Sequence, residues 1–451
     1  MVRFFRTTAI AAGLLVASNP VFADDLVTIM ELAMRNDPTL RQAEAQLNAN
    51  RTQLDMARAS ILPQANATFS EQRQNSGLAG DISYTELPAS TRRYSLGLSQ
   101  ALFNLSSWYN YQGAKDAERA QILNFQAQEQ DLIIRVATAY FNVLRAIDDL
   151  TTRRQEEEAS QRQFERTQQR EEVGLVAITE VYEAQAVYDL ARNNTILAQD
   201  TLATSYEALE AITGQPHPNI DTLVDDFPAE QVEGDMERWV SEALNNNPQL
   251  LAARAAVEAQ TEVTKARRSA RLPTVNLQGG YQYVDSTANQ GTDGSVRSAG
   301  AIEGVSLSVQ VSIPLYTGHS LTAQQEQAEY NLVAQQEAAT LARRQTTQNI
   351  RNAYRRVNTD ALVINQRQQA IVSAEAALNA IEAGYEVGTR NIVDVLQSRQ
   401  QLFVALRNYS DARYNYVIDS LELKRRAGVL TPQDIIDLNE WLTDESESAT
   451  Q

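Results

Sequence analysis

Two short segments of this sequence carry side chains that could do chemistry. VGLVAITEV runs from Val173 to Val181, and VGTRNIVDV runs from Val387 to Val395, 214 positions later. In each segment a glycine is followed by an acid, which is Glu180 in the first and Asp394 in the second. Carboxylates form charge-assisted hydrogen bonds, and several carboxylates that converge attract and bind cations. Each segment interrupts a long helical pattern, so the chain makes the same acidic turn twice.

The other reactive residue types argue against an enzyme. The chain has no cysteine, which excludes disulfides, thiol catalysis, cysteine-based metal sites and an acylated N-terminal cysteine. Its two histidines, His217 and His319, lie in turn-like contexts and indicate neither catalysis nor metal binding. No phosphate-binding loop, catalytic triad or zinc-ligand spacing occurs. We therefore expect no enzymatic activity, no cofactor and no metal.

Residues 1–23 have the pattern of a secretory signal peptide. Arg3 and Arg6 form a positive start, Ala9 to Ala17 form a short apolar core, and Val21 to Ala23 form a cleavage site. No later stretch reaches about 18 apolar residues, so no membrane-spanning helix is expected. Loss of the two signal arginines changes the formal net charge from −18 to −20. So acidic a chain would repel nucleic acid and anionic membrane surfaces.

The sequence also contains an internal duplication. NDPTL at residues 36–40 recurs as NNPQL at 246–250, and ARASILP ending at Pro63 recurs as ARRSARLP ending at Pro273. Self-similarity of this kind indicates two copies of one structural unit. The predicted organisation is a first repeat at 24–213, a linker at 214–238, a second repeat at 239–428, and a C-terminal segment with an acidic tail at 429–451.

Each repeat predicts the same order of elements. A helix comes first and ends before a proline, because the residue before proline is pushed out of the α region. Two strands follow, and then a helix that would reach about 100 Å at 1.5 Å per residue. The acidic turn reverses the chain, and a shorter helix returns. The predicted helices are Asp24–Leu62 and Trp239–Leu272, Ser106–Glu172 and Ser320–Tyr385, and Thr179–Thr213 and Asn391–Ala427.

The first long helix shows two patterns along its length. Apolar residues at a 4-3-4-3 spacing predict a coiled-coil seam. Further along, the charged run RRQEEEASQRQFERTQQREE predicts a solvated face with ion pairs four residues apart. The predicted seam consists of Ile133, Ala137, Tyr140, Leu144 and Ile147.

The strand segments alternate polar and apolar residues. TVNLQGGYQY at 274–283 and VSLSVQVSI at 305–313 alternate cleanly, and YSLGLS at 94–99 does so too, whereas QANATFSEQ at 64–72 alternates weakly. One interpretation is a soluble sandwich. The other is a transmembrane barrel with apolar residues facing lipid, in strands of about 9–11 residues.

A barrel would require more than one chain. Four strands cannot close a barrel, since about eight is the practical minimum. Two chains would give eight strands with a packed interior, and three would give twelve with an open lumen. Trp108, Tyr109 and Tyr111 follow the second strand, where they suit an aromatic belt at a membrane interface, although each could equally pack between helices.

The residues that carry the two turns resemble the TolC family of outer-membrane efflux proteins. The most specific segments are VGLVAITEV, YEVGTRNIVDVL and ARYNYVIDSLELKRRAG, and the resemblance runs from about Asp24 to Gly428. It implies an α+β membrane protein in the outer membrane of a Gram-negative bacterium. The implied assembly is a homotrimer with a twelve-stranded barrel in lipid, a helical barrel in the periplasm, and an equatorial belt made by the linker and the C-terminal segment.

The resemblance also implies a function and partners. Such proteins are passive exit ducts that dock with a periplasmic adaptor, also called a membrane fusion protein, and with an inner-membrane pump of the RND, ABC or MFS type. Drugs or secreted proteins would pass through the duct.

At the turns, the resemblance implies a gate. Gly174 and Gly388 would let each chain reverse. Arg390 would pair with Glu180 and Thr179, and Tyr385 would bond to the same region. Family members commonly have Asp where this chain has Glu180. Asp394 would form an acidic ring at the pore constriction, while the next ring position is Gln397 in place of a second Asp.

Two alternatives remain open from the residues. Glu180 and Asp394 could simply favour helix N-termini, where a carboxylate stabilises by about 0.3–1 kcal/mol. The whole chain could instead be a soluble periplasmic coiled-coil adaptor or scaffold. An adaptor has one helical hairpin flanked by compact β modules, whereas this sequence predicts two hairpins and lipid-patterned strands.

Overall fold

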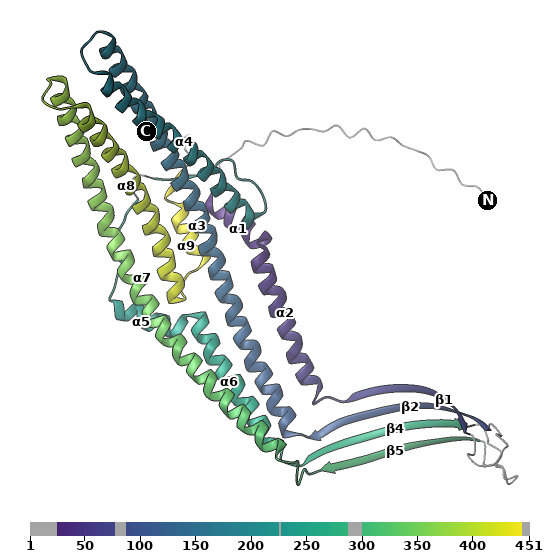
Figure 1. Ribbon diagram of the computed structural model, residues 1–451. Helices are drawn as coiled ribbons and strands as arrows, with labels where there is room; N and C mark the ends of the chain where they lie inside the picture. The colour runs from purple at the N-terminus through teal and green to yellow at the C-terminus, as the bar shows by residue number, and fades with distance from the viewer. Residues whose placement is uncertain (1–24, 77–86, 225–226, 287–299, 444–451) are drawn as a thin grey trace, which may run out of the picture.

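The computed structural model describes residues 25–76, 87–224, 227–286 and 300–443. The predicted signal peptide, most of both loops that join the strands, and the acidic tail lie outside these residues. The chain is mostly helical, with a four-stranded sheet. Figure 1 shows the helices gathered in an elongated bundle, from one end of which the four strands leave at an angle.

Two very long helices set the length of the bundle. α3 (Leu105–Glu172) has 68 residues and α7 (Ser320–Glu386) has 67, so each spans about 100 Å at 1.5 Å per residue. The return helices are α4 (Ile178–Thr213) and α8 (Ile392–Ala427). These four predicted helices are confirmed to within one residue at each end. None of the helices in the described ranges has the length and apolar character needed to cross a membrane.

The first helix predicted in each repeat is wrong as a single element. The structure has two helices there, α1 (Leu26–Asn36) and α2 (Pro38–Ala59), and in the second repeat α5 (Met236–Asn246) and α6 (Pro248–Ser269). The break falls at a residue before proline, which is disfavoured in the α region. Asp37 and Asn247 leave the helical conformation there, with ψ of 119° and 117°.

The same two break residues cap the helices that follow. A side-chain oxygen of Asp37 accepts a hydrogen bond from the Leu40 backbone N–H at 2.7 Å, and that of Asn247 accepts one from Leu250 at 3.0 Å. Each cap satisfies an amide that would otherwise lack a partner in the first helical turn. The chain therefore bends at each proline without exposing unpaired backbone groups.

The helices α2 and α6 stack end to end with the return helices α4 and α8. Asn36 donates through its side chain to the Thr213 carbonyl at 2.9 Å, and Asn247 donates to the Arg426 carbonyl at 3.0 Å. α4 and α2 thereby lie in succession along α3, as α8 and α6 do along α7 (Figure 1). Gly214 and Gly428 end the return helices in the left-handed region, with φ of 79° and 77°.

The sheet has the order β1-β2-β4-β5, with every neighbouring pair antiparallel. Strands of 13 to 17 residues exceed the predicted 9–11, because pairing continues past the alternating segments. β1 and β5 are the two edges. The strands are β1 (Gln64–Ser76), β2 (Leu87–Phe103), β4 (Thr274–Ser286) and β5 (Gly300–Ser312).

The register of the sheet separates its two faces. Leu96 lies opposite Tyr281, which lies opposite Val305, so apolar residues of three strands share one face. One position along, Ser95 lies opposite Gln282 on the other face. Since side chains alternate across a strand, the sheet has one apolar and one polar face. The weakly patterned β1 keeps the same register, with Phe69 opposite Tyr94.

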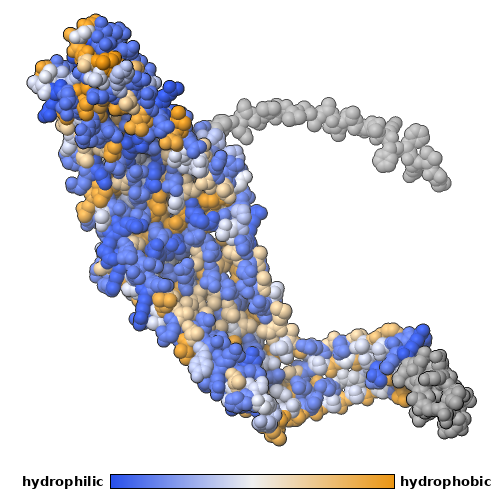
Figure 2. All heavy atoms as spheres, viewed as in Figure 1, coloured by the Kyte–Doolittle hydropathy of each residue, from blue (hydrophilic) through white to orange (hydrophobic). Residues whose placement is uncertain are grey.

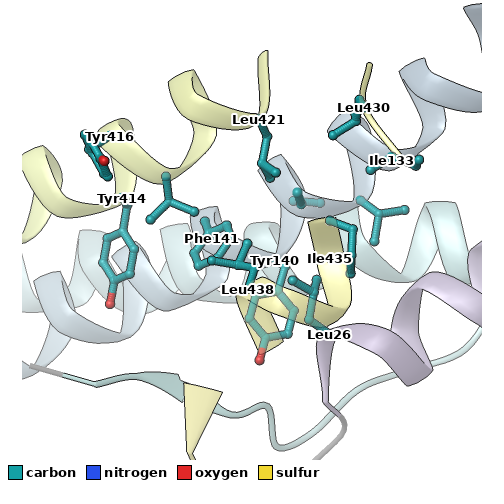
Figure 3. Close-up of a cluster of buried hydrophobic side chains, with 14 of the residues drawn as sticks. Leu26, Ile133, Tyr140, Phe141, Tyr414, Tyr416, Leu421, Leu430, Ile435 and Leu438 are labelled. Carbon is teal, nitrogen blue, oxygen red and sulfur yellow. The ribbon is translucent and has the colours of Figure 1, made fainter. Parts of the chain in front are cut away.

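The waist of the bundle holds its largest core. Tyr140 and Phe141 of α3 are fully buried there against Leu26 of α1 and Ile435 of α9 (Pro432–Asn439), as Figure 3 shows. Of the predicted seam, Ile133, Ala137, Tyr140 and Leu144 are buried and Ile147 is partly buried.

The linker and the C-terminal segment meet at this waist. β3 (Thr222–Leu223) of the linker pairs antiparallel with β6 (Leu442–Thr443). The Tyr140 hydroxyl donates to the Asp221 carbonyl at 2.7 Å, which ties the linker to α3. The segments that flank the second repeat therefore pack together around the middle of the long helices.

Candidate gate at the hairpin turns

The two hairpin turns lie at the end of the bundle away from the sheet (Figure 1). They share one backbone conformation. Gly174 and Gly388 both have φ of 76°, a conformation that L side chains adopt only with strain. The Leu175 N–H donates to the Arg170 carbonyl at 2.8 Å, and the equivalent Thr389 N–H donates to Gly384 at 2.8 Å. Each glycine thus closes its long helix in the same way.

In the second turn, Asp394 forms its hydrogen bonds with the first turn of its own helix, α8. The Asp394 carboxylate accepts a hydrogen bond from the Asn391 N–H at 3.4 Å, while the Asn391 side chain accepts one from the Asp394 N–H at 2.8 Å. This reciprocal capping box satisfies two amides at the start of α8. The predicted role of Asp394 at a helix N-terminus is therefore confirmed.

Arg390 also stays within the second turn. Its guanidinium lies 3.9 Å from the Asp394 carboxylate, and its side chain is 59% exposed. Within the described part of this chain, no ion pair joins Arg390 to Glu180, and exposed Thr179 makes no side-chain hydrogen bond. A single chain therefore does not bring the predicted arginine link together.

In the first turn, the acid reaches across to the other hairpin. The Tyr385 hydroxyl of α7 donates to a Glu180 carboxylate oxygen of α4 at 3.3 Å. The N-cap residue of α4 is Ala177, whose methyl side chain cannot form a hydrogen bond. Glu180 therefore has no N-cap side chain in its own turn with which to form a capping box. Of the predicted gate residues, Tyr385 and Glu180 are thus the pair that one chain brings together.

The surroundings of Tyr385 hold its ring in place and keep its hydroxyl protonated. The Arg170 guanidinium lies over the ring, 5.0 Å from its centroid. Burial raises the pKa of the Tyr385 hydroxyl, the Arg170 charge opposes that rise, and Glu180 raises the pKa further. Tyr385 therefore remains a hydrogen-bond donor at neutral pH. It packs against a small core of Ile392, Val395 and Leu396.

The two predicted constriction residues lie on one side of the start of α8. Asp394 is partly buried and Gln397, three residues later, is exposed. Residues three apart on a helix are neighbours on its surface. An exposed glutamine beside a capping aspartate gives this end of α8 one negative charge where two acids would give two.

Sequence reasoning missed a polar seam on α3, of which Glu156 contacts the other hairpin. The run interpreted as a solvated face does contain the exposed pair Arg162–Glu158, but four of its residues are buried. The interpretation is wrong for those four. Their 4-3-4 spacing repeats that of the apolar seam, offset by two positions from its heptad, and that spacing is the signal that could have revealed them. The buried polar residues are Glu156, Ser160, Gln163 and Thr167.

Arginines of α8 hold this polar seam. The Arg407 guanidinium lies 2.9 Å from the Glu156 carboxylate, which also lies 3.4 Å from Arg153. Arg399 donates to the Ala159 carbonyl of α3 at 3.1 Å and pairs with Glu382 of α7. Interfaces of this kind have discrete partners that can be exchanged, unlike a continuous apolar core. The contact between the hairpins thus combines these polar links with the small apolar core near the turns, against which Val187 of α4 also packs.

The predicted interface aromatics stand where the sheet joins α3. The rings of Trp108 and Tyr111 lie 5.9 Å apart, and the Lys265 ammonium of α6 lies 5.9 Å from the Tyr109 ring centroid. Trp108 is exposed, whereas the two tyrosines are partly buried. The cluster thus packs α3 against α6 and leaves one indole outward.

Comparisons with known proteins agree with this architecture. A family model described as outer membrane efflux protein matches residues 29–215 and 239–429. The chain is 36% identical to outer membrane protein TolC of Vibrio cholerae, over 96% of this chain and 97% of that protein. It is 26% identical to the alkaline protease secretion protein AprF of Pseudomonas aeruginosa, over 96% and 90%. The solved structure of VceC from Vibrio cholerae matches with a TM-score of 0.74 at 19% identity, over 89% of this chain and 96% of that chain.

Proposed function

This chain belongs to the outer membrane efflux protein family, and we propose that it is the outer-membrane exit duct of a tripartite efflux or type I secretion system. It would passively conduct drugs or secreted proteins from a pump to the exterior. One observation carries the proposal: a sheet with one apolar face sits at one end of two hairpins about 100 Å long, and a hydrogen-bonded turn pair sits at the other. The soluble scaffold alternative finds no support among the relatives.

The sheet supports assembly of three chains. The protein is in the outer membrane, with its helices extending into the periplasm. β1 and β5 have no strand partner on their outer edges within the described chain, and unpaired edges seek partners. Three chains would join these edges into twelve strands, enough for an open lumen. The apolar face of the sheet would then face outer-membrane lipid, and Trp108, Tyr109 and Tyr111 would lie at the membrane interface.

Each repeat would contribute both to the sheet and to the helical bundle. Residues 24–213 and 239–428 would each supply two strands and one hairpin. The linker at 214–238 and the segment at 429–451 would form an equatorial belt, which the β3–β6 pairing supports. Such a duplication would give six hairpins around the lumen of a trimer.

The turns would form the periplasmic gate. The Tyr385–Glu180 hydrogen bond would hold the two hairpins of one chain together at rest. Arg390 is exposed and unlinked to Glu180 in its own chain, so in a trimer it would pair with Glu180 and Thr179 of a neighbour. Threefold symmetry would bring three Asp394 carboxylates to the axis as a cation-attracting ring, lined further by Gln397. Opening would be an iris-like movement of the hairpins.

Partners would bind at the same end. Figure 2 shows apolar residues at the hairpin ends, and Val173, Leu175 and Val387 are exposed there. A periplasmic adaptor, or membrane fusion protein, would dock its coiled-coil tips on these turns and bind the open state more tightly. An inner-membrane pump of the RND, ABC or MFS type would supply the energy.

Single-channel conductance in a planar bilayer tests this function. Wild-type protein should give a small, cation-preferring conductance, and Arg390→Ser should raise it several-fold by removing an inter-chain link. Arg344→Ser is the matched control, because Arg344 is exposed on α7 away from the turns. A pore indifferent to Arg390→Ser would contradict the proposed gate. No conductance, with protein that stays dissolved without detergent, would contradict the duct.

A further inference from the structure

A cavity of about 470 Å³ opens at the waist, outside the proposed gate and lumen constriction. Its floor is apolar and includes Leu421 and Leu438, which Figure 3 shows in the waist core. Its size falls within the range of small-molecule sites. We call it the waist pocket. Four aromatic residues and four acids line it: Phe227, Trp239, Tyr416 and Trp441, with Glu230, Glu233, Asp434 and Asp437.

The aromatic residues form walls rather than a closed stack. Phe227 packs edge to face against Trp441, with centroids 5.8 Å apart at 86°, and against Tyr416 at 6.1 Å and 65°. Two polar groups of the walls already have hydrogen-bond partners. The Tyr416 hydroxyl donates to the Glu230 carbonyl at 2.7 Å, and the Trp239 indole N–H donates to the Glu233 carbonyl at 3.2 Å. Apart from the Trp441 indole N–H, what the walls can offer a ligand is the negative face of their rings.

The charge around the pocket is unbalanced. Lys424 bonds to Asp434 at 2.6 Å, so the pocket's cation is neutralised by one acid. Among the described residues, no cationic side chain pairs with the carboxylates of Glu230 and Glu233, and Asp437 accepts only from the neutral Gln433 amide at 2.8 Å. Three unpaired carboxylates therefore surround an aromatic, apolar volume.

We propose that the waist pocket binds an organic monocation with an apolar body. Aromatic faces attract cations, and they do so best when the cation is poorly hydrated. The carboxylates at the mouth would add long-range attraction, while an anion of the same shape would be repelled. A small metal ion would gain little, because among the described residues no three His, Cys, Asp or Glu side chains are grouped closely enough to hold one. The pocket is lined by the linker, α7, α8 and α9 at the waist, so it lies apart from the turns that form the proposed gate.

Tryptophan fluorescence of the full-length protein in a non-ionic detergent can test this proposal. The chain has three tryptophans, of which Trp239 and Trp441 line the pocket and Trp108 lies where the sheet joins α3. The probe is tetraphenylphosphonium, and its matched control is tetraphenylborate, which has the same shape and the opposite charge. We expect saturable quenching by the phosphonium and none by the borate beyond that of free tryptophan in the same micelles.

Variants locate the site. Trp441→Leu keeps an apolar side chain but removes the ring, and should weaken binding about tenfold. Glu233→Gln leaves the core untouched and should weaken it about fivefold, as expected for one exposed charge. Glu258→Gln, at an exposed acid on α6, should leave the affinity unchanged.

Three results would overturn the proposal. One is equal quenching by both probes, which would indicate partition into detergent. Another is an unchanged affinity in both pocket variants. The third is loss of binding in Asp394→Asn, which would place the cation at the pore constriction. The conductance measurement stands apart from all three, so failure of the pocket and failure of the duct can be told apart.

Discussion

The two hairpin turns have the same backbone but use their acids differently. Both glycines have φ of 76°, and both long helices close on the same pattern of amide bonds. Asp394 nevertheless accepts from its own turn, whereas Glu180 accepts from Tyr385 on the other hairpin. The equivalent N-cap positions hold Asn391 and Ala177, and only the asparagine can engage its acid in a capping box. The difference at this one capping position thus explains why Asp394 caps its own helix while Glu180 links the two hairpins.

The same kind of divergence occurs elsewhere in the two repeats. At the helix breaks, Asp37 pairs with Arg135 at 2.8 Å, whereas its equivalent Asn247 is neutral. At the ends of the return helices, Gly428 is crowded and Gly214 is not. Between the helices of the hairpins, the second has Asp360 and Asp419 where the first, 214 positions earlier, has Ala146 and Ser205. The two repeats therefore share one backbone, whereas side chains at equivalent positions make different contacts.

The largest difference is expected at the glycines that end the return helices. A Cβ at Gly428 would lie 2.4 Å from the Asn246 carbonyl oxygen, while at Gly214 the nearest atom would be 3.7 Å away. Gly428→Ala should destabilise by about 2–5 kcal/mol, from left-handed strain plus the clash, and Gly214→Ala by about 1–2 kcal/mol from strain alone. Thermal melting followed by circular dichroism measures both. Equal losses would show that the crowding at Gly428 is relieved.

The helix breaks should differ in their pH dependence. Burial alone would raise the pKa of Asp37, which is 2% exposed, but hydrogen bonds and charge from Arg135 bring it below its usual value. The stabilisation is therefore present above the ordinary carboxyl pKa of about 3.9 and is lost as the pH falls through the lower folded value. Asp37→Asn keeps the cap and should cost about 1.5–3 kcal/mol at pH 7.

That cost should shrink in acid, as the pH falls below the ordinary carboxyl value toward the lowered folded pKa of Asp37. Asn247→Ala is the comparison variant; it removes the cap and the hydrogen bond to the Arg426 carbonyl, and it should cost about 2 kcal/mol at every pH because neither bond involves a titrating group. Urea unfolding at pH 7 and pH 3 provides the comparison. A cost for Asp37→Asn that is the same at both values would contradict the role given to Arg135.

Asp360 and Asp419 of the second hairpin should give stability a pH dependence opposite to that given by Asp37. Burial and the neighbouring Asp419 carboxyl raise the pKa of Asp360 to about 7, although Arg356 opposes the rise. Because the folded pKa is raised, the folded state loses stability as the pH rises from about 4 to 7. Asp360→Asn mimics the protonated acid and should stabilise by about 1 kcal/mol at pH 8, with little change at pH 4. Ala146→Ser is the control in the first hairpin.

The N-caps of the return helices should show the smallest effect. Asn391→Ala removes the capping box and should cost about 1 kcal/mol. Ala177→Asn should give the first turn a cap of its own and stabilise α4 by about the same amount. If the new asparagine also draws Glu180 into its turn, the Tyr385 bond should weaken, and amide exchange at the two turns would report both changes. Protection unchanged at both turns would contradict the division of tasks between the two acids.

Much of this fold could be predicted because its signals are local. Glycine at each turn placed both hairpins to within one residue, and the spacing of Ile133, Ala137 and Tyr140 identified the seam of the first. The breaks at Pro38 and Pro248 were missed although the same proline rule had been applied at Pro63, because the flanking sequence keeps a helical pattern. β1 was underestimated because two of its apolar positions, Ala65 and Ala67, are small.

The site was harder to predict than the fold. A polar residue with seam spacing, such as Glu156, resembles a solvated one until the partner Arg407 is known, and that partner lies 251 positions away. The Tyr385–Glu180 bond spans 205 positions, and only the packed hairpins bring it together. Sequence patterns therefore identified the residues of the turns without showing which of them meet within one chain.

The most direct test of the gate is the conductance of Tyr385→Phe in a planar bilayer. This variant removes one hydroxyl and its bond to Glu180, while the ring under Arg170 remains. Loss of a hydrogen bond to a charged group is worth about 1.5 kcal/mol, so the open population should rise roughly tenfold. Tyr182→Phe is the control, since Tyr182 lies near the first turn and is 63% exposed. A rise for Tyr385→Phe alone is predicted, and identical conductance for wild type and both variants would contradict the account.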